Sequence, residues 1–140
     1  MKIFVCIKQV PDTETKIKIA ADNSSVDTSS VKWIMNPYDE YAVEEAIKIK
    51  EATPGAQIFV ITVCPKKRAN ELLITALAMG ADEGIVIDSP ENLDPLTTAK
   101  ALSQTIKGEG GADLIFTGKL AIDDNACSVG QMVAEFLNIP

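Results

Sequence analysis

The chain has 140 residues, 46% of them hydrophobic, which predicts one folded domain with a substantial core rather than a disordered segment. Its formal net charge of −7 argues against nucleic acid and against anionic membrane surfaces as partners, because both attract basic proteins. The sequence contains no histidine, which removes the commonest general base and the commonest zinc ligand.

The first part of the chain predicts a strand, an irregular excursion and a helix. The apolar run Ile3–Ile7 is nearly continuous, as strands buried on both faces of a parallel sheet are. Residues 11–35 alternate weakly and then become polar, so we interpret them as an excursion that contains a short strand pair. Asn36-Pro37 predicts a helix start, with Asn36 as the capping residue, and Pro54-Gly55 predicts its end.

The remainder of the chain alternates strands with helices. A helical apolar period over residues 69–77 ends at Gly80, and Asp94-Pro95 predicts another capped helix start. A last helix is expected over residues 129–137. Three more buried strands are expected, at Ile58–Val63, Gly84–Ile87 and Leu114–Thr117.

This order of elements predicts an α/β fold. Strands that alternate with helices form a mostly parallel sheet between two helical layers, which is a three-layer α/β/α arrangement with the Rossmann-like topology of adenine-nucleotide-binding domains. We expect a single domain over residues 1–140, with the excursion at about 11–35 inserted before the first helix. The order of the strands in the sheet does not follow from the sequence.

Ligands of open parallel sheets bind beyond the carboxyl ends of the strands. Residues 88–94 also follow a strand, but we interpret them as an ordinary connection. The segments that we expect to form a site are Cys6–Val10, Asn36–Asp39, Val63–Pro65 and Gly118–Gly130.

The segment Gly118–Gln131 is the most informative of these, because it is a long strand-to-helix loop where the other such loops are short. Amide groups at the start of the following helix would suit a phosphate, and Asp123 or Asp124 could accept hydrogen bonds from ribose hydroxyls. The alternative is that Asp124, Asn125 or Ser128 only caps the helix. The two strong phosphate-loop fingerprints, G-x-x-x-x-G-K-[ST] and G-x-G-x-x-G, are absent from the sequence.

Two other features have both a structural and a functional interpretation. Asn36–Asp39 is explained by a helix start alone, or it faces an adenine or ribose. Cys6 and Cys64 are expected to be small, buried wall residues rather than reactive thiols. Cys127 is the third cysteine, and because the three are widely spaced, we expect neither a disulfide nor a metal site.

Several strings resemble the β subunit of electron-transfer flavoproteins. They are K-Q-V-P-D-T, M-N-P-Y-D-E-Y-A-V-E-E-A, T-A-L-A-M-G-A-D, G-K-L-A-I-D-D-N and V-G-Q-M, in the order of the family. The nucleotide contacts that the resemblance implies are Cys6, Asn36, Pro37, Tyr38, Asp39, Cys64, Gly118, Asp123, Asp124, Asn125, Ala126, Cys127, Ser128, Val129, Gly130 and Gln131.

The resemblance implies a non-catalytic subunit rather than an enzyme. Such a subunit binds AMP, or a second FAD in the electron-bifurcating class, and V-G-Q-M favours AMP because the bifurcating class more often reads V-G-P. It pairs with an α subunit that holds FAD, and the heterodimer carries electrons from acyl-CoA-type dehydrogenases, as in fatty acid oxidation, to a quinone oxidoreductase at the membrane. Family members continue beyond the position of Pro140, so we expect the C-terminal portion of the family to be absent here.

Two rival functions share the predicted site. One is a free-standing adenine-nucleotide sensor or stress-response domain, and the other is an enzyme that activates a substrate with ATP. The second would need a Ser/Gly-rich loop after the first strand, where Lys8-Gln9-Val10-Pro11 stands. No signal or transit peptide and no membrane-inserted segment is expected, so the sequence predicts a soluble protein of the bacterial cytoplasm.

Overall fold

The computed structural model describes residues 1–91 and 93–140, which form a sheet covered by helices on both faces. The sheet contains β1 (Lys2–Cys6), β4 (Gln57–Cys64), β5 (Glu83–Asp88) and β6 (Leu114–Thr117), in the order β5-β4-β1-β6. All neighbouring strands are parallel. The predicted α/β/α architecture is confirmed, and each of these strands begins and ends within one residue of its predicted position.

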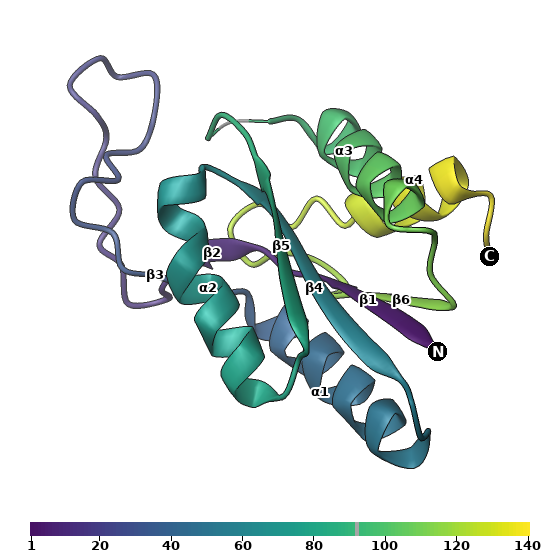
Figure 1. The fold of residues 1–140 in the computed structure, drawn as a ribbon. Helices are drawn as coiled ribbons and strands as arrows, with labels where there is room; N and C mark the ends of the chain where they lie inside the picture. Colours follow the sequence, from purple (N-terminus) through teal and green to yellow (C-terminus); the bar gives the residue numbers. More distant parts are fainter. Residues whose placement is uncertain (92) are drawn as a thin grey trace.

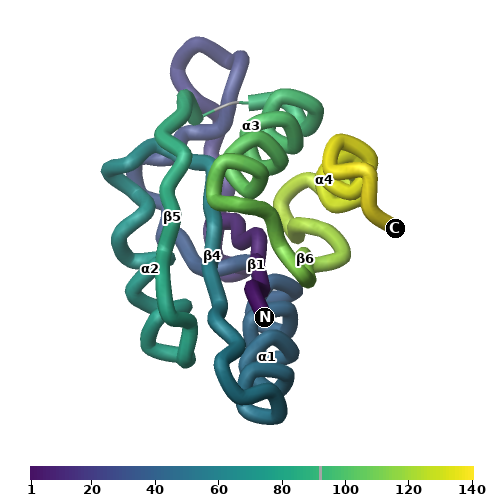
Figure 2. Tube along the Cα trace, turned by 45° about the vertical axis from the view of Figure 1, so that its right-hand side comes forward, coloured from purple at the N-terminus to yellow at the C-terminus, as the bar shows by residue number. Residues whose placement is uncertain are grey.

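The two faces of the sheet bury different side chains, because successive residues of a strand point to opposite sides. Ile3 and Val5 belong to a core cluster with residues of α1 (Pro37–Ala52) and α2 (Lys66–Met79). Phe4 and Cys6 belong to a second cluster with residues of α3 (Pro95–Gly108) and α4 (Val129–Leu137). Figure 2 shows the helix pairs on opposite sides of the sheet.

The ends of the helices match the sequence signals. Asp94 caps α3 by accepting a hydrogen bond from the Thr97 N–H at 2.9 Å. Gly80 has φ +132°, and its N–H donates to the Leu77 carbonyl, so it ends α2 as predicted. Pro37 and Pro95 stand at the beginning of α1 and α3.

The excursion before α1 leaves the body of the molecule as an extended arm (Figure 1). β2 (Gln9–Pro11) and β3 (Trp33–Met35) pair antiparallel at its base, so a short strand pair is present, but its first strand begins two residues before the predicted excursion. Further out, an isolated antiparallel bridge joins Ile19 to Val26, and both side chains are exposed.

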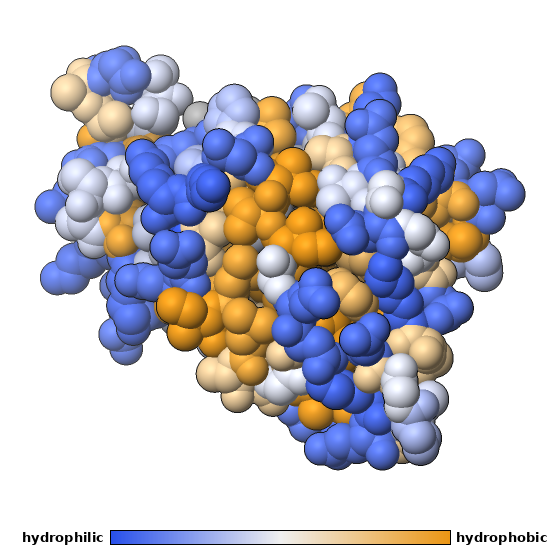
Figure 3. All heavy atoms as spheres, in the orientation of Figure 1, coloured by the Kyte–Doolittle hydropathy of each residue, from blue (hydrophilic) through white to orange (hydrophobic). Residues whose placement is uncertain are grey.

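β5 lies at one edge of the sheet. In Figure 3, apolar side chains form a band over the position that β5 occupies in Figure 1. Ile85, Val86 and Ile87 in the centre of this strand are partly exposed, while Glu83 and Asp88 at its ends are exposed. Among the helices of residues 1–91 and 93–140, none is long and apolar enough to cross a membrane.

The order of the strands defines a crevice. The chain moves outward from β1 to β4 and β5, and then returns to form β6 on the other side of β1. The direction of winding therefore reverses between β1 and β6, and a ligand site is expected beyond the carboxyl ends of these two strands.

Candidate functional site

A cavity of about 220 Å³ lies at the carboxyl ends of β1 and β6. Its walls come from the ends of β1 and β4, the start of α1, the segment from β6 to α4, the connection from β5 to α3, and α3 itself. The predicted site residues that line it are Cys6, Asn36, Asp39, Gly118, Asp124, Ala126, Cys127, Ser128, Val129 and Gly130.

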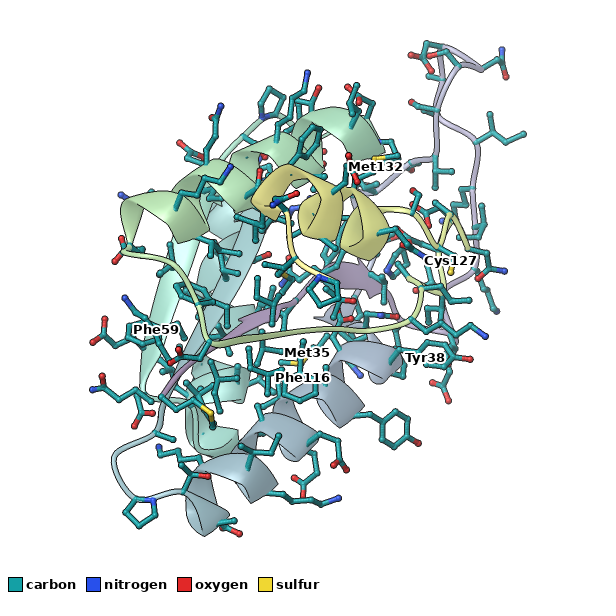
Figure 4. All side chains as sticks on the ribbon, turned by 90° about the vertical axis from the view of Figure 1, so that its right-hand side faces the viewer. Met35, Tyr38, Phe59, Phe116, Cys127 and Met132 are labelled. Carbon is teal, nitrogen blue, oxygen red and sulfur yellow. The ribbon has the colours of Figure 1, made fainter. Side chains whose placement is uncertain are left out.

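The other predicted site residues are near this cavity in sequence but are not part of its lining. Figure 4 shows Tyr38 at the start of α1 and Cys127 before α4, at the same end of the molecule. The Tyr38 side chain is 42% exposed. Within the described ranges, the predicted residues outside the lining are Pro37, Tyr38, Cys64, Asp123, Asn125 and Gln131.

Asn36 and Asp39 are buried at the point where three chain segments meet. Asp39 accepts hydrogen bonds from the Lys8 N–H at 2.7 Å and from Asn36 Nδ2 at 3.0 Å. Asn36 Nδ2 also donates to the Leu120 carbonyl at 2.9 Å, and Asn36 Oδ1 accepts from the Ile122 N–H at 3.2 Å. Asn36 occupies the N-cap position of α1, as predicted, but in the described part its side chain makes no capping hydrogen bond.

The Asp39 carboxyl group has an unusually high pKa. Burial raises its pKa to about 6, although the hydrogen bonds from Asn36, Lys8 and Gly118 act in the opposite direction. The same carboxylate explains the glycine at 118, since a Cβ there would lie 2.1 Å from Asp39 Oδ1. The backbone of Gly118 thus approaches Asp39 more closely than a residue with a side chain allows.

Lys8 ties the loop before α4 to the end of β1. Its Nζ lies 2.8 Å from Asp123 Oδ1 and 3.1 Å from Asp124 Oδ2. Burial disfavours the charged form of Lys8, but the hydrogen bonds and charges of these aspartates raise its pKa above the ordinary value. The two carboxylates that we expected to be able to accept hydrogen bonds from ribose hydroxyls are thus also paired with a lysine.

The loop reaches α4 through two residues in the left-handed conformation, Asn125 with φ +52° and Cys127 with φ +47°. Among the described residues, Ser128 at the N-cap makes no side-chain capping bond. The first amides of α4 thus remain available to an anion. Gly130 lies in this first turn, and a Cβ there would be 2.8 Å from Thr117 Oγ1.

The predicted burial of two cysteines is confirmed, but of these two only Cys6 lines the cavity. Cys6 and Cys64 are buried, and burial, with the nearby Asp39 carboxylate, raises the pKa of the Cys6 thiol to about 12. A thiol in this state is a wall residue and a poor nucleophile. Cys127 is half-buried and lines the cavity. Across residues 1–91 and 93–140, no cluster of Cys, Asp and Glu is placed to hold a metal ion.

Two features of the cavity were not foreseen. The interpretation of residues 88–94 as an ordinary connection is wrong, because Ser89, Pro90, Glu91 and Leu93 line the cavity, while residue 92 lies outside the described residues. The connection joins β5 to α3, which packs on the face of the sheet opposite to α2, and it therefore passes over the crevice. Lys8 was included in the segment after the first strand, but its pairing with two aspartates was not foreseen. The rule that ligands bind beyond the carboxyl ends of parallel strands would have identified both features.

The fold and this cavity define a Rossmann-like α/β domain with a pocket at the reversal of strand order. A family model described as the electron transfer flavoprotein domain matches residues 24–140. The chain therefore belongs to the electron transfer flavoprotein family.

Relatives with curated names are β subunits of electron transfer flavoproteins. That of Dictyostelium discoideum is 45% identical over 140 residues, which cover 100% of this chain and 55% of that protein. That of Bradyrhizobium diazoefficiens is 41% identical over 137 residues, covering 98% and 54%. The human protein is 40% identical over 144 residues, covering 100% and 56%. The chain thus spans about half the length of the curated relatives it matches.

Proposed function

We propose that residues 1–140 form a nucleotide-binding domain of a non-catalytic electron-transfer flavoprotein subunit. The observation that carries the proposal is the cavity at the reversal of strand order, which the first turn of α4 faces with Ser128, Val129 and Gly130. Helix N-terminal amides and two close backbone approaches, at Gly118 and Gly130, suit the phosphate and ribose of an adenine nucleotide.

AMP is the nucleotide that we propose, with FAD as the alternative. The cavity has a volume of about 220 Å³, below the roughly 300–1,000 Å³ typical of ligand sites, and AMP is the smaller of the two candidate ligands. Gln131 after Gly130 supports the same choice through the resemblance to the ordinary class. Val63, at the end of β4, and Leu102 on α3 give the cavity apolar walls for a base.

The redox chemistry would be supplied by FAD in a partner α subunit. We propose that the pair accepts electrons from acyl-CoA-type dehydrogenases and passes them to a quinone oxidoreductase. Membership of the electron transfer flavoprotein family supports this proposal over a free-standing nucleotide sensor, which would use the same cavity.

Two measurements test the nucleotide site. Acid extraction of the purified chain should release AMP, and AMP should rebind to the stripped chain by calorimetric titration. Gly130→Asp should weaken AMP binding by at least about tenfold, because it sets a negative charge beside the phosphate. Gly130→Asn is the matched control, since its side chain meets Thr117 in the same way without the charge.

The comparison of the two variants separates charge from shape. The proposal requires the asparagine variant to bind AMP more tightly than the aspartate variant, with both folded by circular dichroism. Equal affinities in the two variants would place the phosphate elsewhere. Failure of the stripped chain to bind either AMP or FAD would refute the nucleotide-binding function.

A further inference from the structure

A second cleft of about 220 Å³ lies at the base of the arm, between β3 and α2. Apolar side chains form part of its walls, with Ile34 and Met35 contributed by β3 and Leu72 by α2. Among residues 1–91 and 93–140, no residue lines both this cleft and the cavity at the reversal of strand order. The cleft is therefore a separate feature of the molecule.

One wall of the cleft holds a buried polar group without a partner. Gln9 lines the cleft and is only 8% exposed, and its Oε1 accepts no hydrogen bond from the residues that the structure describes. Buried polar groups are nearly always paired, so an unpaired acceptor in a cleft favours a donor that comes from a ligand. A donor that enters the cleft gains this hydrogen bond without displacing another partner.

The other polar groups of the cleft are acceptors as well. Glu40 and Glu71 are exposed carboxylates that line it, and within the described ranges neither forms an ion pair. The Thr75 hydroxyl donates to the Glu71 carbonyl at 2.9 Å, so its lone pairs are left for a ligand. In the described part of the chain, no lysine or arginine lines the cleft, and Arg68 lies instead over the ring of Trp33 at 4.1 Å. Such a lining selects a ligand that carries hydrogen-bond donors and positive charge.

The arm beside the cleft exposes apolar side chains. Ile19 faces Val26 across the antiparallel bridge, so their side chains share one side of the arm, and they are 72% and 45% exposed. Ile17, two residues before Ile19, is 62% exposed. The arm leaves the body at β2 and β3, which also contribute Gln9 and Trp33 to the cleft (Figure 1). A protein that reaches into the cleft can also cover these side chains, whereas a small amine cannot.

We propose that the cleft between β3 and α2 binds a lysine side chain of a partner protein. The ammonium group donates to Gln9 Oε1 and faces the carboxylates of Glu40 and Glu71. The methylene stem of the lysine lies against the apolar walls, as the stems of long cationic side chains do. The exposed apolar side chains of the arm cover the partner surface around this lysine. The inference does not rest on the nucleotide, because the two sites are separate.

The first test titrates the isotope-labelled full chain with Nα-acetyl-lysine methylamide and follows it by amide NMR. We expect saturable shifts at Gln9, Trp33 and Leu72, since these residues line the cleft from three elements. Nα-acetyl-norleucine methylamide carries a similar stem without the charge, and it should bind at least about threefold more weakly. Equal binding of the two compounds, or no binding of the lysine compound, would overturn the proposal.

Two substitutions locate the ammonium group. Gln9→Leu removes the unpaired acceptor and Glu71→Gln removes a carboxylate, and each should weaken binding of the lysine compound by about threefold or more. Glu135→Gln is the matched control, because Glu135 is exposed on α4, which packs on the other face of the sheet. Its affinity should stay within about 1.5-fold, since distant surface charges are screened. Glu71 is exposed, so its variant keeps the core intact, and an effect no larger than that of Glu135→Gln would refute the role of the cleft.

A peptide distinguishes a protein partner from a free amine. A nine-residue peptide in which leucine and serine alternate around a central lysine spans roughly 30 Å when extended, so its ends can reach the arm. It should bind at least about tenfold more tightly than cadaverine, because its leucines bury apolar surface of the arm. Ile19→Ser should reduce this advantage, whereas Ile139→Ser, at the exposed end of the chain, should not. Cadaverine that binds as tightly as the peptide, or a peptide whose advantage survives Ile19→Ser, would overturn the assignment of the cleft and arm to a protein partner.

Discussion

At the scale of single residues, the cavity depends on two glycines that let backbones approach. Gly118 lies against the Asp39 carboxylate and Gly130 against the Thr117 hydroxyl, and a Cβ at either site would lie closer than 3.0 Å to those groups. Gly118 follows β6 and Gly130 is in the first turn of α4, so the two residues bracket the loop. Their lack of a side chain allows the loop to fold back on the end of the sheet.

Substitution of Gly118 tests this close approach. Gly118→Ala should lower the free energy of unfolding by roughly 1–3 kcal/mol, because the added methyl group overlaps a buried carboxylate that is held from several sides. Gly108→Ala is the control, since no atom lies within 4 Å of the new Cβ and the residue is in α3. Urea denaturation measures both. Equal stability of the two variants would show that the backbone at 118 has room to move.

The protonation of Asp39 gives a second prediction. Its pKa of about 6 in the folded chain exceeds the ordinary 3.8, so the folded state binds this proton more tightly than the unfolded state. The tighter binding of this proton stabilises the folded state by on the order of 3 kcal/mol. This stabilisation is complete below pH 3.8 and is lost as the pH rises through about 6. Carbon NMR of the Asp39 carboxyl group should show a midpoint near 6. A midpoint below 3.8 would mean that the hydrogen bonds from Asn36, Lys8 and Gly118 outweigh burial.

The sequence identified polar residues at strand ends as site residues, but it did not reveal their hydrogen-bond partners. Asn36 and Asp39 were predicted as site residues from the Asn-Pro-Tyr-Asp string and its place before a helix. Their hydrogen bonds to Leu120 and Gly118 join positions about eighty residues apart, and no local pattern encodes such a pairing. Local rules placed Asn36 correctly at the N-cap of α1, but they did not predict that its side chain bonds to the loop before α4 instead of capping the helix.

At the scale of elements, α3 and α4 hold the mouth of the cavity against the sheet. Ile106 of α3 is fully buried and belongs to the cluster that contains Phe4 of β1 and Val133 of α4. The buried side of α3 follows from helical geometry, because Ala99, Leu102 and Ile106 recur at helical spacing and are all buried. The connection before α3 was misassigned, since its path over the crevice depends on which face of the sheet the helix covers.

A pair of isoleucines tests the docking of α3. Ile106→Ala should lower the free energy of unfolding by about 2–5 kcal/mol, because it leaves a cavity in the core. Ile74→Ala on α2 is the matched control, since Ile74 is 64% exposed and its loss should change stability by less than about 0.5 kcal/mol. Thermal unfolding separates them. A small effect of Ile106→Ala would show that α3 is loosely attached.

At the scale of the whole molecule, the function that we propose depends on the strand order β5-β4-β1-β6. The strands themselves were predictable from their continuous apolar runs, whereas their order was not. The order follows from the faces that the crossover helices cover, with α1 and α2 on one side and α3 on the other. The return of the chain to β6 opens the crevice beside β1, where the cavity is found.

The most direct test of this account is a map of AMP on the isotope-labelled chain by amide NMR. The account predicts that stoichiometric AMP shifts the amides of residues 117–130 most strongly, together with Lys8 at the end of β1 and Ser89 after β5. Shifts confined to a second cleft, between β3 and α2, which Trp33 and Glu71 line, would contradict the account. So would an unchanged spectrum of the stripped, folded chain with AMP in excess.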